Sequence, residues 1–425
     1  MLEITTIRQN PSHVIERLGA KNFDKAAQAI TDILALDAQR RAVQQQLDDA
    51  RNQNKTISEQ IGKLYKQGNQ QQANELKQQV NTINDNIRQL ETNMGSIEQQ
   101  LDAQLVQLPN LPHQSVPLGK HPDDNQVVKT SGTVPTLHPN AKPHWDLVTQ
   151  YNLVNFEIGA KITGSGFPLY IGKGARLQRA LINFFLDEAI AAGYTEYLPP
   201  HLVNEASAYA TGQLPDKEGQ MYHATADNLY LIPTAEVPLT NIYRDVILKQ
   251  DELPVKLTGY TPCFRREAGS HGIGTRGLNR LHQFDKVEIV QIQHTDNSYQ
   301  ALEEMLQHVE GLLTKLGLPY RVLRLCGGDM SFTSALTYDL EVFSAAQQQW
   351  LEVSSVSNFE TYQANRLKLR FRDTETKKNI LAHTLNGSAL ALARIVASLL
   401  ENNQTPNGIT VPQALQKYTG FDIID

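Results

Sequence analysis

Apolar positions between residues 26 and 108 recur with alternating steps of three and four, in two rows that we call the first and second seams. The seams are Leu36, Arg40, Val43, Leu47, Ala50, Asn54, Ile57, Ile61 and Leu64, and then Ala73, Leu76, Val80, Ile83, Ile87, Leu90, Met94, Ile97 and Leu101. A repeat of about 3.5 residues, kept over several heptads, predicts a coiled coil. Gly68 and Asn69, between the seams, can end a helix. We therefore predict an antiparallel helical hairpin with arms at about 26–66 and 70–108.

The composition of this hairpin does not decide its purpose. It holds eight Lys or Arg residues and ten Asp or Glu residues, so its overall charge gives no support for binding phosphates. Its Gln, Asn and few basic side chains could still contact a nucleic-acid backbone locally. A dimerisation zipper or a scaffold rod is the alternative.

Seven prolines between residues 109 and 143 prevent a helix there, and we predict a linker. Four histidines lie in or beside this segment, with spacings that match no metal site. They are His113, His121, His138 and His144, and we expect solvated loop histidines.

The remaining pattern predicts an α+β domain over residues 144–425. Residues 177–192 have the pattern of an amphipathic helix that Gly193 closes. Short β-rich runs then follow one another without regular helices between them, at 228–232, 257–267, 283–292, 320–325 and 365–372. This order favours a mixed, mainly antiparallel sheet flanked by helices. The predicted organisation is thus an N-terminal domain at 1–108 with the hairpin, a linker at 109–143 and this sheet domain.

Charge and cysteine content narrow the class of protein. The 425 residues carry a net charge of −6, so any nucleic-acid partner would be held by local patches. Two distant cysteines, Cys263 and Cys326, exclude a disulfide framework. The N-terminus lacks the apolar segment of a signal peptide, and no run of about 18 apolar residues occurs. We expect a cytosolic protein without a membrane span.

A glycine motif at residues 272–277 matches G-x-G-x-x-G but lacks the context of a dinucleotide site. That site needs a strand directly before the glycines and a helix directly after them. Here a polar segment precedes the motif and a strand pattern follows it. We predict a flexible loop that joins two antiparallel strands.

Charged and aromatic residues flank this loop. Arg265 and Glu267 end the first strand, and Arg280 and Phe284 begin the second. Arginine can hold a phosphate or carboxylate bidentately, glutamate can accept from an amine, and phenylalanine can stack on a base. A surface hairpin with ordinary ion pairs is the alternative.

Three further polar clusters lie at 234–236, 352–358 and 386–394. The second alternates carboxylate and hydroxyl groups that could hold a hard cation. Capping, a polar strand face and tight helix packing explain each cluster equally well when it is taken alone. Together they lack a nucleophile–base arrangement and indicate binding and charge stabilisation, which suit phosphoryl or nucleotidyl chemistry.

These segments resemble the signature motifs of class II aminoacyl-tRNA synthetases. Residues 193–200 (GYTEYLPP) resemble motif 1, Arg265, Glu267, Arg280 and Phe284 resemble motif 2, and residues 387–394 resemble motif 3. With TAE at 234–236, EVSSVSNF at 352–359 and the hairpin, nearly the whole chain resembles the bacterial type of seryl-tRNA synthetase.

The resemblance implies the reaction and the site residues. L-serine and ATP would form seryl-adenylate, and the seryl group would pass to the 3′ end of tRNA(Ser). The implied catalytic residues are Arg265, Glu267 and Arg394. The implied serine site is Thr234, Ala235, Glu236, Arg265, Glu288, Asn386 and Ser388. The implied ATP site is Arg265, Arg266, Glu267, Phe284, Glu352, Val353, Ser354, Ser355 and Arg394, with Glu352 and Ser355 as ligands of Mg²⁺.

Further expectations follow from the same resemblance. The loop at 268–279 would close over ATP, and the hairpin would grip the long variable arm of the tRNA across a homodimer. The sequence does not decide whether tRNA(Sec) would be charged with serine as well. Ala389, Ala391 and Ala393 depart from the glycine-rich motif 3 pattern, and Val356 replaces a common cysteine.

Two other functions remain as alternatives. A paralogue that adenylates a small amino acid for a carrier protein would be expected to lack the hairpin. A non-catalytic tRNA-binding protein would be expected to lose Arg265, Glu267, Glu352 or Arg394, and all four are present.

Overall fold

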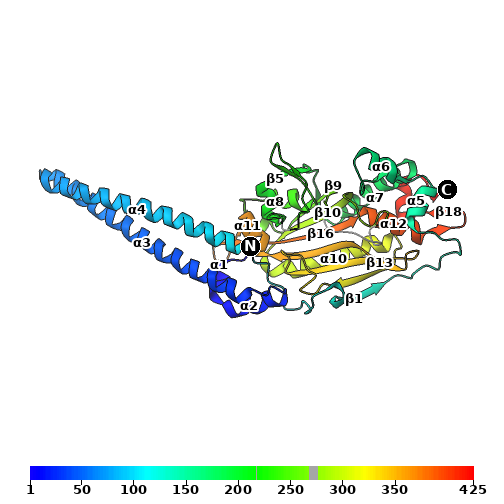
Figure 1. Cartoon of the computed structure of the whole chain (residues 1–425), viewed down its shortest axis with the longest axis horizontal. Coiled ribbons are helices and arrows are strands. Elements are labelled where there is room, and N and C mark those ends of the chain that lie inside the picture. The colour runs from blue at the N-terminus through cyan, green and yellow to red at the C-terminus, as the bar shows by residue number, and fades with distance from the viewer. Residues whose placement is uncertain (217, 268–275) are drawn as a thin grey trace. The chain divides into compact units, whose positions relative to one another are not determined.

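The computed structural model describes residues 1–216, 218–267 and 276–425, and the chain divides into two compact units, Met1–Pro109 and Asn110–Asp425. The first unit contains four helices, with α3 and α4 lying side by side along their length (Figure 1). They are α1 (Ile4–Gln9), α2 (Pro11–Ala20), α3 (Ala26–Lys66) and α4 (Gln70–Leu105). The predicted helical hairpin is thereby confirmed. Gly68 takes a left-handed conformation in its turn, with φ +76°.

Both seams face the interior of the hairpin. Val43 and Leu47 of α3 pack with Met94 and Ile97 of α4 in one apolar cluster. Of the two polar residues of the first seam, Asn54 is paired across the hairpin, because its Nδ2 donates to Asn84 Oδ1 at 2.5 Å. Apolar packing with one satisfied polar pair is typical of a coiled coil with a fixed register.

The second unit is built on an eight-stranded sheet in the order β1-β11-β12-β13-β16-β10-β9-β4. Neighbouring strands are antiparallel except for β4 and β9, which are parallel. The strands are β1 (Gln126–Ser131), β4 (Thr195–Glu196), β9 (Val255–Phe264), β10 (Gln283–Gln293), β11 (Tyr320–Arg324), β12 (Leu336–Ser344), β13 (Gln349–Glu360) and β16 (His383–Ala391). This sheet confirms the predicted mainly antiparallel α+β fold.

Helices and four smaller sheets make up the rest of the described part of this unit. The helices are α5 (His144–Gln150), α6 (Phe156–Ile162), α7 (Gly172–Ala191), α8 (Glu205–Thr211), α9 (Glu236–Asn241), α10 (Ser298–Lys315), α11 (Thr361–Leu367), α12 (Leu392–Asn402) and α13 (Gln413–Thr419), with short 3₁₀ turns at Pro122–Asp124, Gln250–Glu252 and Thr295–Asn297. The smaller sheets use β2 (Val154–Asn155), β3 (Leu169–Tyr170), β5 (Leu202–Asn204), β6 (His223–Ala224), β7 (Leu229–Leu231), β8 (Ile247–Lys249), β14 (Arg370–Arg372), β15 (Asn379–Leu381), β17 (Gln404–Thr405), β18 (Gly408–Thr410) and β19 (Ile423–Ile424).

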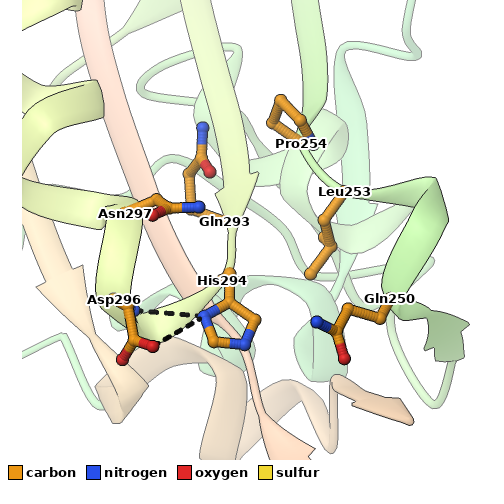
Figure 2. Close-up of a pocket in the computed structure, with 7 residues that line it drawn as sticks. All are labelled: Gln250, Leu253, Pro254, Gln293, His294, Asp296 and Asn297. Atoms are coloured by element: carbon orange, nitrogen blue, oxygen red, sulfur yellow. Dashed lines mark hydrogen bonds and ion pairs between the residues drawn. The ribbon is translucent and has the colours of Figure 1, made fainter. Parts of the chain in front are cut away.

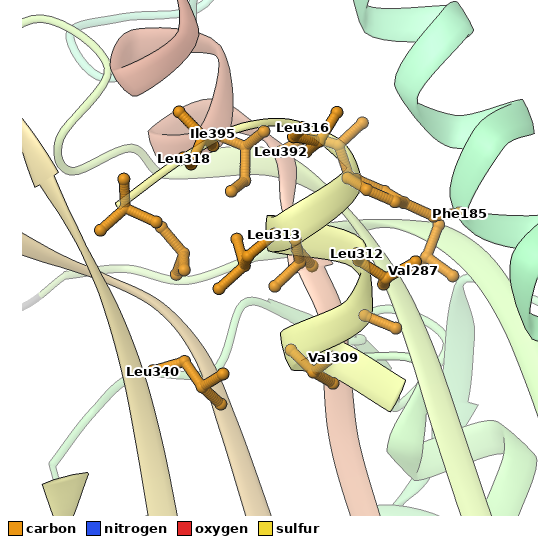
Figure 3. Packing of buried hydrophobic residues seen from close by; sticks show 14 of the residues in the cluster. Phe185, Val287, Val309, Leu312, Leu313, Leu316, Leu318, Leu340, Leu392 and Ile395 are labelled. Atoms are coloured by element: carbon orange, nitrogen blue, oxygen red, sulfur yellow. The ribbon is translucent and has the colours of Figure 1, made fainter. Parts of the chain in front are cut away.

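The main core lies between the sheet and helices α7, α10 and α12 (Figure 3). Phe185 of α7, Leu313 of α10 and Ile395 of α12 are fully buried there against Val287 of β10 and Leu340 of β12. Within the described ranges, none of the helices combines the length and apolar character that a membrane span requires.

The structure differs from the sequence expectation at three places. Residues 110–143 pack as part of the second unit: β1 pairs with β11, and the buried Asn110 Nδ2 donates to the backbone oxygens of Thr333 and Phe359. Proline prevents a helix but tolerates an edge strand, which a linker prediction overlooks. The expected strand at 365–372 is the end of α11 followed by β14. His144 is fully buried and not a solvated loop residue.

Candidate active site

One face of the sheet gathers the polar residues that the sequence singled out. Because side chains alternate along a strand, Phe284, Lys286 and Glu288 of β10 share one face, while Val287 and Ile289 enter the core on the other. On the next strand Ser388 lies directly opposite Glu288, and Asn386 lies on the same face two residues earlier.

Glu288 is fully buried and accepts from three groups. Its Oε2 accepts from Thr234 Oγ1 at 3.0 Å and lies 2.6 Å from Lys286 Nζ, while its Oε1 accepts from Asn386 Nδ2 at 3.0 Å. An ionised carboxylate offers about four acceptor positions. The donors among the described residues therefore leave one position for a further donor, such as a hydroxyl group.

Glu236, at the start of α9, lies in the same buried network. Burial, and then the negative charge of Glu288, raise the pKa of Glu236 to about 7, while a hydrogen bond from Gln363 Nε2 to Glu236 Oε1 at 2.6 Å opposes this. Thr384 in turn donates to Gln363 Oε1 at 2.7 Å. With a pKa of about 7, the Glu236 carboxyl group is partly ionised near neutral pH, and its ionised form can bind a cationic group.

A β-bulge at Val353 brings Glu352 and Ser355 to one face. Ser355 pairs with Asp339 and Glu352 pairs with Glu341, which leaves Val353 as the extra residue. Since Asp339 and Glu341 are two residues apart on β12, their partners share a face as well. Burial, followed by the charge of Glu352, raises the pKa of Asp339 well above its ordinary value, and its Oδ1 is buried without a hydrogen-bond partner among the described residues.

Arg394 reaches this face from the first turn of α12. Its Nη1 donates to the backbone oxygen of Glu352 at 2.6 Å and lies 3.5 Å from the Glu352 carboxylate. Its Nε donates to the backbone oxygen of Asn279 at 2.9 Å. The Arg394 side chain thus links Glu352 of β13, on the acidic side of the site with Asp339, to Asn279 just before β10.

Arg265 and Glu267 follow the end of β9. The Arg265 guanidinium carbon lies 5.3 Å from the centre of the Phe284 ring, and its Nε contacts the backbone oxygen of Pro233 at 3.4 Å. Glu267 accepts from Arg280 Nε at 2.5 Å. The connected end of the β9–β10 pair therefore presents two arginines, one beside an aromatic ring and one beside a carboxylate, as a nucleotide site requires.

Two family models together match most of the chain. The model of the seryl-tRNA synthetase N-terminal domain matches residues 1–112, and that of the tRNA synthetase class II core domain (G, H, P, S and T) matches residues 221–403. The chain is 50% identical to a serine–tRNA ligase of Salinibacter ruber, over 99% of this chain and 98% of the relative. It is 46% identical to a serine–tRNA ligase of Chlorobaculum parvum, with both chains fully covered. The chain belongs to the seryl-tRNA synthetase family.

Solved seryl-tRNA synthetases share the fold over the whole chain. The structure of the Pyrococcus horikoshii seryl-tRNA synthetase complexed with ATP has a TM-score of 0.93 at 34% identity and covers 100% of this chain and 99% of that one. The cytoplasmic serine–tRNA ligase of Naegleria fowleri in complex with AMP has a TM-score of 0.88 at 26% identity, with the same coverage. The predicted family and fold are confirmed.

As expected for a seryl-tRNA synthetase, residues from several segments meet at one face, although not every predicted residue does so. Val353 enters the core, and Ser354 donates to the backbone oxygen of Ser388 at 2.6 Å. Ala235 is buried in an apolar cluster, and Arg266 is exposed. Most of the predicted loop, residues 268–275, lies outside the described residues. The ligand contacts of all these residues stay predictions.

Three residues of this site were not predicted from the sequence. Lys286 could have been found, because it lies two residues before Glu288 on the same strand face. Asp339 and Gln363 come from β12 and α11, and only tertiary structure brings them to the site. Within the described part of the chain, no group of three or more His, Cys, Asp or Glu side chains is placed so that it could hold a metal ion.

A separate cavity of about 250 Å³ lies at the other end of β10, lined by Gln250, Leu253, Pro254, Gln293, His294, Asp296 and Asn297 (Figure 2). Asp296 lies beside the His294 ring there, with its Oδ2 3.6 Å from Nδ1. None of the predicted serine or ATP residues lines this cavity.

Proposed function

We propose that the chain is a serine–tRNA ligase whose serine pocket is built around Glu288. The observation that carries this proposal is the buried carboxylate with three donors and one acceptor position left. The serine hydroxyl would fill that position, whereas alanine would leave it empty. A site built to bind a hydroxyl can reject the analogue that lacks it by a factor of about 10⁴–10⁵. Glu236, when ionised, would hold the serine ammonium group.

The other residues of the three motifs would bind ATP. Arg265 would bridge the serine carboxylate and the α-phosphate, Phe284 would stack on adenine beside Glu267, and Arg394 would hold the γ-phosphate. The serine carboxylate then attacks the α-phosphorus and pyrophosphate leaves. In the second step a ribose hydroxyl at the 3′ end of tRNA attacks the acyl carbon and AMP leaves. Alignment and charge neutralisation can supply the acceleration without a protein nucleophile.

Magnesium fits the acidic side of the site. Glu352 and Ser355 would hold the ion together with phosphate oxygens of ATP. Asp339 pairs with Ser355 across the strands, and its buried Oδ1, which has no hydrogen-bond partner among the described residues, would be a further oxygen ligand. When bound, Mg²⁺ supplies neutralisation of phosphate charge.

The hairpin would bind tRNA(Ser) through the half that contains its turn, residues 51–88, which we call the distal half. Residues 51–88 carry six basic and three acidic side chains, a net charge of +3, while the remaining parts of the two arms carry two basic and seven acidic ones, a net charge of −5. The two basic residues of the proximal part, Arg40 and Arg41, are paired with the buried Asp37. Basic side chains that are not held in ion pairs are better able to contact phosphates. We therefore place the tRNA contacts on the distal half.

A homodimer would form through the segment that resembles motif 1. Leu198 of this segment keeps 84% of its surface accessible, and Ile190 and Leu202, on either side of the segment in the sequence, are exposed as well. Large apolar side chains gathered in one exposed region commonly mark a protein interface. We also propose a cytoplasmic location, because the tRNA is charged there and both cysteines are buried thiols that suit a reducing compartment.

Serine-dependent exchange between ATP and pyrophosphate tests the first step. The assay is run with serine beside alanine, threonine and glycine, and then as aminoacylation of tRNA(Ser) and tRNA(Sec). Exchange with serine alone, followed by charging, is the expected result. Exchange with alanine or glycine without tRNA charging would indicate a carrier-loading paralogue, and tRNA binding without any exchange would contradict an enzyme function.

A further inference from the structure

His144 is a fully buried histidine with a partner on each ring nitrogen. Its Nδ1 lies 2.7 Å from Glu401 Oε1, and its Nε2 accepts from the Leu278 backbone N–H at 2.9 Å. A carboxylate only accepts, so these partners assign the proton to Nδ1 and the lone pair to Nε2. The backbone N–H of His144 donates to the same Glu401 oxygen at 2.8 Å.

This histidine holds the segment 276–279, which directly precedes the motif 2 residue Arg280. Gly277 has φ +67°, and a Cβ atom there would lie 2.3 Å from His144 Nε2, so only glycine allows this approach. The guanidinium carbon of Arg276 lies 4.8 Å from the centre of the Trp145 ring. The first two residues of α5 thus form the surface on which the segment rests.

Glu401 holds the same segment by a second route. Gln347 Nε2 donates to Glu401 Oε1 at 2.8 Å, and Gln347 Oε1 accepts from Asn279 Nδ2 at 2.9 Å. Ser344 donates to the other carboxylate oxygen. Although burial alone would raise the pKa of Glu401, the hydrogen bonds from His144 and Ser344 lower it below its ordinary value. A buried charge with this many donors is seldom needed for stability alone, because apolar residues of similar volume often serve as well.

The segment in turn contacts Arg394, since Asn279 supplies the backbone oxygen that accepts from Arg394 Nε. Arg394 and Glu401 lie seven residues apart on α12, and α5 packs against this helix (Figure 1). Segment 276–279 is therefore tied to α12 near both residues.

We propose that His144 and Glu401 are positioning residues, which hold segment 276–279 so that Asn279 aims Arg394 at the phosphates of ATP. The inference rests on the proposed function, in which Arg394 binds ATP. Both residues lie outside the motifs, and neither would touch a substrate.

Steady-state pyrophosphate exchange with the full chain tests this role, with the KM for ATP and for serine measured separately. His144→Leu removes the acceptor for Leu278 at a similar volume. We expect the KM for ATP to rise by about tenfold or more, because small misplacements of binding groups have effects of this size, with the KM for serine nearly unchanged. His383→Leu is the matched control, since His383 is also buried and its Nδ1 bonds Ser298 at the far end of β16. The control should lower the Tm without separating the two KM values.

A double-mutant cycle distinguishes positioning from general destabilisation. On an Arg394→Ala background, His144→Leu should have little further effect on exchange, because residues that act through one contact are not additive. Should His144→Leu fail to fold, Gln347→Leu removes the second route at a half-buried position and should produce the same selective rise in the KM for ATP.

Equal changes in both KM values, or additive effects in the cycle, would overturn the inference. A failure of the proposed function itself would look different, because the unmodified chain would then show no serine-dependent exchange.

Discussion

At the scale of single residues, the raised pKa of Glu236 predicts pH-dependent serine binding. Burial and the charge of Glu288 raise this pKa to about 7, and only the ionised form would bind an ammonium group well. The ionised fraction of such an acid rises about tenfold between pH 6 and pH 8. The KM for serine in pyrophosphate exchange should fall by a similar factor, and Glu236→Gln should flatten the profile. A parallel change in the KM for ATP would argue against this assignment.

The same carboxyl group should make folding stability depend on pH. Because its pKa is raised from 4.5 to about 7 on folding, the native state binds more protons than the unfolded state between these values. Its contribution to the free energy of unfolding is therefore present at pH 4.5 and lost as pH rises through 7, by about 3 kcal/mol at most. Urea unfolding of the unmodified chain and of Glu236→Gln at pH 5 and pH 8 isolates this contribution, which should disappear in the variant.

The buried Lys286–Glu288 pair allows serine selectivity to be separated from stability. Glu288→Ala would leave the ammonium group of Lys286 buried without a partner and should cost about 3–5 kcal/mol of stability. The double variant Lys286→Met with Glu288→Gln removes both charges at similar volume, so it should fold nearly as well as the unmodified chain. It should nevertheless lose at least about 100-fold of the preference for serine over alanine in kcat/KM. Retained selectivity in the folded double variant would contradict the proposed role of Glu288.

At the scale of helices and strands, regular patterns were predictable and interruptions were not. The two seams predicted the hairpin correctly, because the spacing of a coiled coil can be read from residues that are close together in the sequence. The bulge at Val353 is different: with regular alternation, Glu352 and Ser355 would lie on opposite faces, and the bulge brings them together. The residues themselves therefore gave no reason to pair them, and only the family resemblance did so. His144 was misjudged for a related reason, since its partners lie on α12 and in segment 276–279.

The charge division along the hairpin predicts which basic residues contact tRNA. Among the described residues, Lys55, Lys63 and Lys66 form no ion pair, and all three are exposed. Changing the three to alanine should weaken tRNA binding and lower the slope of log Kd against log salt by up to about 0.9 for each lost phosphate contact. Serine-dependent pyrophosphate exchange should be unchanged. A control variant, Lys249→Ala with Lys378→Ala, removes two exposed cations from the second unit, and an equal loss of affinity for each removed charge would indicate only a charge effect.

At the scale of the whole molecule, the two units contribute different parts of the proposed reaction. All residues assigned to serine and ATP lie in Asn110–Asp425, and the basic half of the hairpin lies in Met1–Pro109. Sequence patterns identified both parts, because each has its own periodicity. They could not give the extent of the second unit, where a proline-rich stretch supplies an edge strand of the main sheet.

If the hairpin of one subunit serves the active site of its partner, mixed dimers should reveal it. One subunit carries Lys55→Ala, Lys63→Ala and Lys66→Ala, and the other carries Arg265→Ala. In the mixed dimer the intact hairpin then lies on the subunit opposite the intact active site, so aminoacylation should recover relative to both parent homodimers. Placing all four substitutions on one subunit beside an unmodified one should instead leave charging no higher than in the homodimer with the altered hairpin, because the intact active site then faces the altered hairpin. Pyrophosphate exchange should be half of the unmodified level in both dimers, which controls for assembly. Charging only in the second arrangement would mean that each hairpin serves its own subunit, and a failure to form dimers would contradict the interface at Leu198.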